Sequence, residues 1–165
     1  MIEITEASAQ DFPAIQAIAY KTWPVTYGHI LSKEQLDYML YLMYSTESLQ
    51  KSAAKGHQLL LLKEDNAALG FASYEHNYLD KNVTRLHKLY MLPESQGKGA
   101  GKMLIETIEK LAKENGSDAV SLNVNKFNNA FSFYKKAGYE VVGEEDIEIG
   151  RGYLMEDYKM EKQLP

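Results

Sequence analysis

Apolar residues in the first third of the chain recur first with a strand period and then with a helical one. Residues 1–5 alternate apolar and polar positions, which predicts a strand. From residue 12 the apolar positions recur at helical spacing, which predicts a helix that breaks at Pro24. A second helix, opening at Ser32, is apolar nearly all round, so we expect it to be buried on two sides, to line a pocket or to form a subunit contact. A short third helix is expected to be capped by Thr46.

The rest of the chain predicts strands and helices in alternation. The predicted elements are strands at 57–63, 69–78 and 83–92, a helix at 102–115, a strand at 119–124, a helix at 128–137, and strands at 140–142 and 153–160. This order predicts an α/β fold in a single domain over residues 1–165. We expect a mixed, mostly antiparallel sheet flanked by helices, with a strand–helix–strand–helix unit at its centre.

Composition narrows the class of protein. The 165 residues are 45% apolar and 25% charged, as in globular domains. The chain has no cysteine, which excludes disulfides, cysteine-ligated zinc and a cysteine nucleophile. It opens without a basic or apolar leader and has no apolar run long enough for a bilayer. We therefore expect a soluble, cytoplasmic protein with no membrane partner.

Charge is spread unevenly along the chain. The formal net charge is −5, which argues against a general nucleic-acid binder. Residues 81–102 carry five Lys or Arg against one acid, whereas residues 140–161 carry eight acids against two basic residues. The basic segment could hold an anion and the acidic one could attract a cation. An ordinary solvated surface is the alternative for both segments.

A glycine-rich loop follows the strand predicted at 83–92. The segment Gln96-Gly97-Lys98-Gly99-Ala100-Gly101-Lys102 ends at a helix N-terminus, a combination that binds phosphate. The P-loop pattern fails, because its first glycine would be Gln96 and its last position, Met103, is neither Ser nor Thr. The dinucleotide fingerprint fails as well, because its third glycine would fall on Lys102.

Two motifs carry a resemblance to a known enzyme family. Gln96-x-x-Gly99-x-Gly101 resembles the pyrophosphate loop of the GCN5-related N-acetyltransferase (GNAT) superfamily, Q/R-x-x-G-x-G/A. A second family motif, A-x-x-[FL]-Y-x-x-x-G-[FY], is matched at Ala130, Phe133, Tyr134, Gly138 and Tyr139. In the family an Asn often stands three residues before the Ala of this motif, where this chain has Phe127, so we take Asn128, one residue later, as its equivalent.

The resemblance implies acetyl-CoA as cosubstrate. Backbone groups of Leu89 and Met91 would pair with the pantetheine amides, and the loop would bind the pyrophosphate. Asn128 and Lys136 would touch the far end of the cofactor, with a plain surface lysine as the alternative for Lys136. The implied cofactor-binding residues are Leu89, Tyr90, Met91, Gln96, Gly97, Lys98, Gly99, Ala100, Gly101, Lys102, Asn128 and Lys136.

Two residues are candidates for the catalytic proton transfers. Tyr134 matches the family's helix tyrosine, and a phenol can protonate a departing thiolate. A core tyrosine is its alternative. His87, on the strand before the loop, is the candidate base, because an imidazole titrates near neutral pH. A surface or strand-packing histidine is its alternative. No H-E-x-x-H spacing occurs, so we expect no metal.

The acceptor amine is expected on the opposite side, lined by the first two helices and their connection. Trp23, Tyr27 and His29 lie there, and aromatic rings suit a cationic amine, with core packing as their alternative. Trp23-Pro24-x-x-Tyr27 resembles the corresponding stretch of bacterial polyamine acetyltransferases. We therefore expect direct transfer of an acetyl group from acetyl-CoA to a polyamine or other small primary amine.

Two other functions stay open from the sequence. The acceptor could instead be a protein N-terminus or a lysine, which a grooved, neutral acceptor face would favour. The chain could also be a non-catalytic regulator that binds acyl-CoA, although a pure binder has no need of an acid at Tyr134. A homodimer is compatible with the helix that is apolar on both sides at 36–44.

Overall fold

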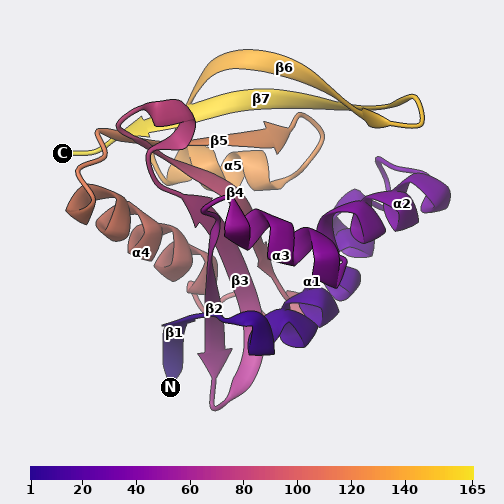
Figure 1. Ribbon diagram of the computed structural model, residues 1–165, viewed down its shortest axis with the longest axis horizontal. Helices are drawn as coiled ribbons and strands as arrows, with labels where there is room; N and C mark the ends of the chain where they lie inside the picture. Colours follow the sequence, from indigo (N-terminus) through magenta and orange to yellow (C-terminus); the bar gives the residue numbers. More distant parts are fainter.

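Seven strands form one sheet in the computed structural model, which describes residues 1–165. The strands are β1 (Ile2–Glu6), β2 (Gln58–Glu64), β3 (Ala67–Glu75), β4 (Val83–Met91), β5 (Ala119–Asn125), β6 (Glu140–Gly150) and β7 (Tyr153–Gln163). Their order in the sheet is β1-β2-β3-β4-β5-β7-β6 (Figure 1). Only β4 and β5 are parallel, and every other pair is antiparallel. The predicted α/β fold with a mixed, mostly antiparallel sheet is confirmed.

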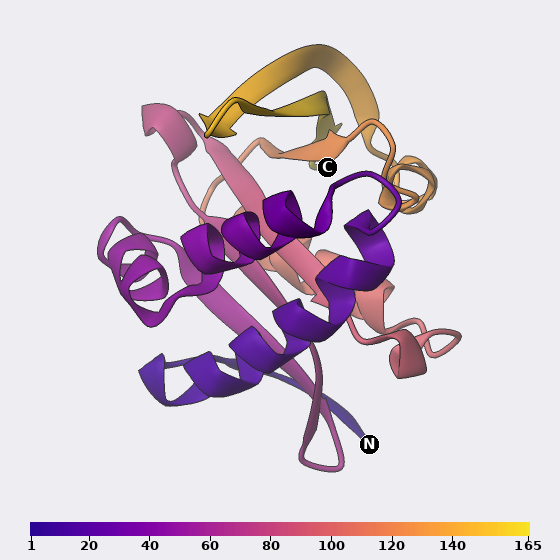
Figure 2. The same ribbon diagram turned by 90° about the vertical axis from the view of Figure 1, so that its right-hand side faces the viewer.

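Helices cover both faces of this sheet. They are α1 (Phe12–Tyr27), α2 (Lys33–Tyr44), α3 (Thr46–Ala54), α4 (Ala100–Glu114) and α5 (Ala130–Lys136). The first three lie together on one face (Figure 2), where α1 packs against β3 and β4. The longer helix of the second half, α4, packs against β2, β3, β4 and β5. No helix is both long and apolar enough to cross a membrane.

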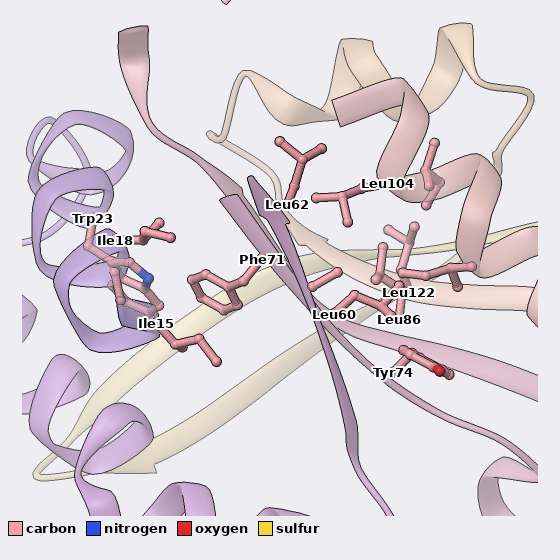
Figure 3. Packing of buried hydrophobic residues seen from close by; sticks show 14 of the residues in the cluster. Ile15, Ile18, Trp23, Leu60, Leu62, Phe71, Tyr74, Leu86, Leu104 and Leu122 are labelled. Atoms are coloured by element: carbon pink, nitrogen blue, oxygen red, sulfur yellow. The ribbon is translucent and has the colours of Figure 1, made fainter. Parts of the chain in front are cut away.

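The core is divided between these two faces. Ile15, Ile18 and Trp23 of α1 lie beside Phe71 on one side of the sheet (Figure 3). Leu104 of α4 lies on the other side, near Leu62. Because both layers bury apolar side chains, the strands between them are fixed from two directions. The middle of the sheet is therefore a rigid frame for whatever its loops carry.

The first helix differs from the prediction at Pro24. The sequence predicted a break there, but α1 continues through Pro24 to Tyr27. Trp23 and Tyr27 are both buried on the face that packs on the sheet, and this packing outweighs the cost of a proline inside a helix. The proline ring removes one backbone donor, while its own carbonyl still accepts from the N–H of Gly28 at 3.0 Å.

Other differences follow from which side chains reach the core. The second helix lines a cavity with Met39, Met43 and Tyr44, so that alternative is confirmed. Tyr41 on its other side is 70% exposed, so burial on two sides is wrong. Ser45, not Thr46, supplies the capping oxygen of α3, accepting from the N–H of Ser48 at 3.2 Å. The strand predicted at 140–142 extends to Gly150, because its acids face solvent while its backbone pairs with β7.

A bulge bends β4 where the sheet opens. Ser73 of β3 pairs with Lys88 and Tyr74 pairs with Leu86, so His87 is the extra residue of the bulge. The parallel pairing of β4 with β5 also ends at Leu86, opposite Leu122. Beyond that point the two strands diverge, and the edge of β4 that faced β5 carries no ladder. This gap lies at the centre of the sheet.

Gly70 of β3 pairs with Met91 in the diverging part of β4 and leaves no room for a side chain. A Cβ added to Gly70 would lie 2.1 Å from Sδ of Met91 and 2.9 Å from the carbonyl oxygen of Tyr90. We therefore expect Gly70→Ala to lower the free energy of unfolding by about 1–3 kcal/mol, as overpacking does. Urea denaturation measures the effect. The control is Gly143→Ala, whose Cβ would meet only Cδ of Lys159 at 3.5 Å, and an equal loss in both variants would contradict the account.

Candidate active site

Two cavities meet in the gap between β4 and β5. The first, of about 200 Å³, opens between α1, α2, β4, β5 and β7. The second, of about 340 Å³, lies between β4, the glycine loop and α5. Their walls share five residues, which are Leu89, Tyr90, Asn128, Ala130 and Tyr134. A ligand entering from either side would therefore reach the same small group of side chains.

Three tyrosines and an asparagine occupy this meeting point. The hydroxyls of Tyr27 and Tyr90 share a hydrogen bond of 2.9 Å, and Nδ2 of Asn128 donates to the Tyr27 hydroxyl at 3.4 Å. Tyr134, on α5, is 7% exposed and lines both cavities. Burial raises the pKa of Tyr134, so its hydroxyl keeps the proton at neutral pH. A protonated phenol at this point can act as an acid.

The glycine loop presents free backbone donors beside the second cavity. Gly97 and Gly99 have φ values of +82° and +69°, which residues with a side chain rarely adopt. No side chain caps α4, and none of the N–H groups from 97 to 102 donates to another backbone carbonyl. These donors and the positive end of α4 make a site that fits a phosphate group.

The lysines expected to help the loop are engaged elsewhere or exposed. Nζ of Lys98 lies 2.5 Å from Oε1 of Glu64, at the end of β2. Nζ of Lys102 lies 3.8 Å from Oε1 of Glu106, one helical turn on. Lys136 is exposed at the end of α5. The backbone N–H groups from 97 to 102 are therefore the donors of this loop that the structure leaves free.

The strand segment 89–91 runs along the second cavity. Leu89, Tyr90 and Met91 line it together with Gln96 and Gly101. Their ladder partners on one side are Ala72, Phe71 and Gly70 of β3, whereas β5 no longer pairs with them on the other side. The free edge of β4 can form backbone hydrogen bonds with an extended ligand, as it would with a neighbouring strand. The remaining loop residue of the expected set, Ala100, is buried at the start of α4.

His87 lies in a compact cluster rather than at the tyrosines. Its Nε2 is 2.9 Å from Oε1 of Glu75, and Nε2 of His57 lies 3.3 Å from the same oxygen. The two rings stack in parallel, 3.9 Å apart. Burial lowers the pKa of His87 to about 4, so its ring is neutral at physiological pH. His87 also lies in the wall of the first cavity.

The same cluster is where three metal-ligating groups come together. The ligand atoms of His57, Glu75 and His87 all lie within 4.8 Å of one another. Because the two rings are parallel at 8°, their in-plane lone pairs cannot both aim at one ion without a rotation. In the structure both imidazoles contact one carboxylate oxygen, and Nδ1 of His57 is buried without a partner.

The three residues expected at the acceptor do not all meet. Trp23 and Tyr27 line the first cavity, and the indole N–H of Trp23 donates to the Tyr44 hydroxyl at 3.3 Å. His29 lies outside it, in a separate depression beside Gln35. Its Nε2 is 3.4 Å from the carbonyl oxygen of Phe127, so it contacts the turn before α5 instead.

Two residues of the first cavity were missed by sequence reasoning. Lys88 is half-buried, with Nζ 4.5 Å from the centroid of the Tyr44 ring, and partial desolvation lowers its pKa to about 8. Asp157 of β7 is 7% exposed and faces the cavity. A signal for Asp157 was present, because it shares alternate strand positions with Tyr153 and Met155, on the half-buried face of β7.

Comparisons with known proteins agree with this geometry. Residues 30–162 match the model of the Acetyltransferase (GNAT) domain. A spermidine N(1)-acetyltransferase of Thermoplasma acidophilum is 31% identical over 161 residues, covering 94% of this chain and 96% of that protein. An uncharacterised N-acetyltransferase of Bacillus subtilis is 27% identical over 159 residues, covering 94% of this chain and 90% of that protein.

Solved structures give the same result. The PaiA N-acetyltransferase of Thermoplasma acidophilum, in complex with coenzyme A, superposes with a TM-score of 0.83 at 30% identity, over 99% of both chains. The ribosomal-protein-S18-alanine N-acetyltransferase of Escherichia coli shares the fold, with a TM-score of 0.75 at 17% identity, over 99% of this chain and 94% of that one. With two sequence motifs, the fold and the family model in agreement, this chain belongs to the GNAT family of N-acetyltransferases.

Proposed function

We propose that the protein transfers the acetyl group of acetyl-CoA directly to a primary amine of a small polyamine. The observation that carries the proposal is the meeting of two cavities at Tyr134. One cavity leads to the glycine loop and fits a phosphate-bearing cosubstrate. The other, of about 200 Å³, opens between the N-terminal helices and β7. Two substrates entering from opposite sides would meet at a buried phenol.

The cosubstrate side follows the free edge of β4. Backbone groups at Leu89 and Met91 would bind the pantetheine amides, and the N–H groups from 97 to 102 would bind the pyrophosphate. Gln96 and Asn128 border the same cavity. This path brings the thioester to the point where β4 and β5 diverge, next to Tyr90 and Tyr134.

The transfer itself needs one acid. The neutral amine nitrogen attacks the thioester carbonyl carbon, a C–N bond forms, and the C–S bond breaks. The departing thiolate takes the hydroxyl proton of Tyr134, which burial keeps protonated until then. Because the chain has no cysteine, an acyl-cysteine intermediate is excluded and direct attack remains.

The acceptor side supports a cationic small molecule. Its cavity is lined by the rings of Trp23 and Tyr27, and such rings attract an ammonium group. The buried carboxylate of Asp157 borders the same space. A cavity of about 200 Å³ suits a slender chain better than a folded protein surface. The similarity to a spermidine acetyltransferase at 31% identity points in the same direction.

The test measures release of free coenzyme A thiol from acetyl-CoA. Spermidine, spermine and lysine-bearing peptides are offered separately, and the absence of cysteine keeps the protein itself silent in the assay. We expect amine-dependent release with the polyamines and none with the peptides. Thiol release with the peptides alone would replace the polyamine by a protein acceptor. If none of the amines causes thiol release, a regulator that only binds the cosubstrate would remain.

A further inference from the structure

Asp157 is the one acid of this chain whose side chain is withdrawn from solvent. It is the only Asp or Glu among the buried residues, although the β6–β7 hairpin around it carries many exposed acids. Within the sheet it stands opposite Asn125 of β5 and Glu145 of β6. It also borders the acceptor cavity, together with Tyr27 and Tyr134. A buried carboxylate is costly unless something compensates its charge.

The hydrogen bonds around Asp157 leave two oxygens without donors. Nδ2 of Asn123 donates to Oε1 of Glu145 at 2.9 Å and to Oδ2 of Asp157 at 3.4 Å. These two acceptors fix the orientation of the Asn123 amide. Oδ1 of Asn123 and Oδ1 of Asp157 are then both buried with no partner. Both residues line the acceptor cavity, so a ligand with several N–H donors there would satisfy these two acceptors.

No side chain neutralises the carboxylate. Arg85 of β4 favours its ionisation, but the guanidinium lies over the ring of Tyr78 at 5.1 Å and donates to Ser121 at 3.4 Å. Glu145 and Asp146 of β6 oppose ionisation, and Tyr27 faces it from α1. Burial is the largest effect and raises the pKa of Asp157 to about 6. At neutral pH the group is therefore mostly a carboxylate without an ion-pair partner.

We propose that Asp157 binds the ammonium group of the amine substrate and accepts its proton before the nitrogen attacks. An ammonium carries three N–H donors, which suits the two free oxygens of Asp157 and Asn123. The inference rests on the proposed acetyl transfer to a small amine and names the residue that selects and activates that amine. His87, whose Nε2 already contacts Glu75, then has a structural role at the bulge of β4 and is not the base.

The protons balance over one turnover. The ammonium loses one proton to Asp157, and the neutral nitrogen forms the C–N bond. As the C–S bond breaks, Tyr134 gives its proton to the sulfur, and the second proton leaving the nitrogen replaces it. Asp157 releases its proton to solvent when the products leave. The net result is an amide, a thiol and one proton, with no further reactant.

The first test is the pH profile of kcat/KM for spermidine. It reports groups of the free enzyme, so we expect an acidic limb near pH 6 in the wild type, from the pKa of Asp157. Asp157→Asn should lose that limb and lower kcat/KM by about 100-fold or more at neutral pH, with KM for acetyl-CoA unchanged. An acidic limb that disappears in His87→Gln, and persists in Asp157→Asn, would overturn the assignment.

A second nucleophile distinguishes the loss of a catalytic base from a general structural effect of the Asp157 substitution. Hydroxylamine is uncharged at about pH 7.5 and needs no base to form its nucleophile. We expect Asp157→Asn to lose at least tenfold less activity with hydroxylamine than with spermidine. The matched control is Glu148→Gln, which removes one exposed charge from the neighbouring strand and should leave both reactions unchanged. Equal losses with the two nucleophiles would overturn the proposal.

Binding and stability give readouts that do not depend on turnover. Spermidine should raise the melting temperature of the wild type and of Glu148→Gln, but not that of Asp157→Asn. The folded-state pKa of about 6 lies above the ordinary 3.8, so the ionised group costs stability at neutral pH. Ligand-free Asp157→Asn should therefore melt higher than wild type above pH 6, and this gain should vanish below about pH 4.

These readouts keep the two proposals apart. A wild type that shows no thiol release with any amine, yet is stabilised by spermidine through Asp157, would refute the proposed transfer and retain the ammonium site. Normal polyamine turnover in Asp157→Asn would refute the ammonium site and retain the transfer.

Discussion

Tyr134→Phe is expected to lower kcat about 10²–10⁴-fold while leaving the affinity for acetyl-CoA unchanged. The substitution removes one oxygen from a residue that is buried where the two cavities meet. The ring stays in place, in contact with the rings of Phe133 and Tyr139. Only the proton for the departing thiolate is lost. Steady-state kinetics of thiol release, with calorimetry for acetyl-CoA, measures both parts of the expectation.

The matched control removes a hydroxyl from a neighbouring buried tyrosine. Tyr139 follows the same helix, and its hydroxyl donates to Oε2 of Glu109 at 2.8 Å, away from both cavities. Because the acceptor is a carboxylate, Tyr139→Phe should cost about 1.5–3 kcal/mol of unfolding free energy and leave kcat within about twofold of wild type. Equal kcat in the wild type and Tyr134→Phe would remove Tyr134 from the mechanism and return the proton transfer to water.

Local sequence patterns predicted the central unit of the fold well. The glycine loop was found because glycines in a short segment report backbone geometry directly, and Gly97 and Gly99 do take positive φ values. The buried face of α4 was visible from its helical spacing of Leu104, Ile108 and their neighbours. The position of these elements relative to one another came from the family motifs, not from spacing.

Features that depend on contacts between distant segments were not predictable in the same way. The helix break at Pro24 was wrong, because packing of Trp23 and Tyr27 on the sheet overrides the local preference of proline. His29 was grouped with the aromatic residues of α1 by nearness in sequence, but the turn after α1 carries it to a different depression. Asp157 looked like one more acid of a charged tail, because its burial is created by β5, β6 and α1 together.

Gly101→Leu is expected to raise KM for acetyl-CoA at least about 100-fold, while the protein still folds. A Cβ at Gly101 would lie 3.5 Å from the ring of Phe133 and 3.9 Å from Cγ of Met91, so the first carbon fits in ordinary contact. The rest of a leucine side chain would fill the cavity between β4 and α5, in which Gly101 forms part of the wall. Because leucine favours a helix more than glycine, α4 itself should gain stability from the change.

The control for this variant is Lys110→Leu, on the exposed face of the same helix. It adds the same side chain far from the loop and should leave both kinetic constants near those of wild type. Titration of the two variants with coenzyme A separates binding from turnover, since Gly101→Leu should lose affinity for the free coenzyme as well. A Gly101→Leu protein that binds coenzyme A normally would mean that the cavity between β4 and α5 is not the cosubstrate path. The pantetheine chain would then have to reach Tyr134 by the acceptor side, and the division of the two cavities between two substrates would fail with it.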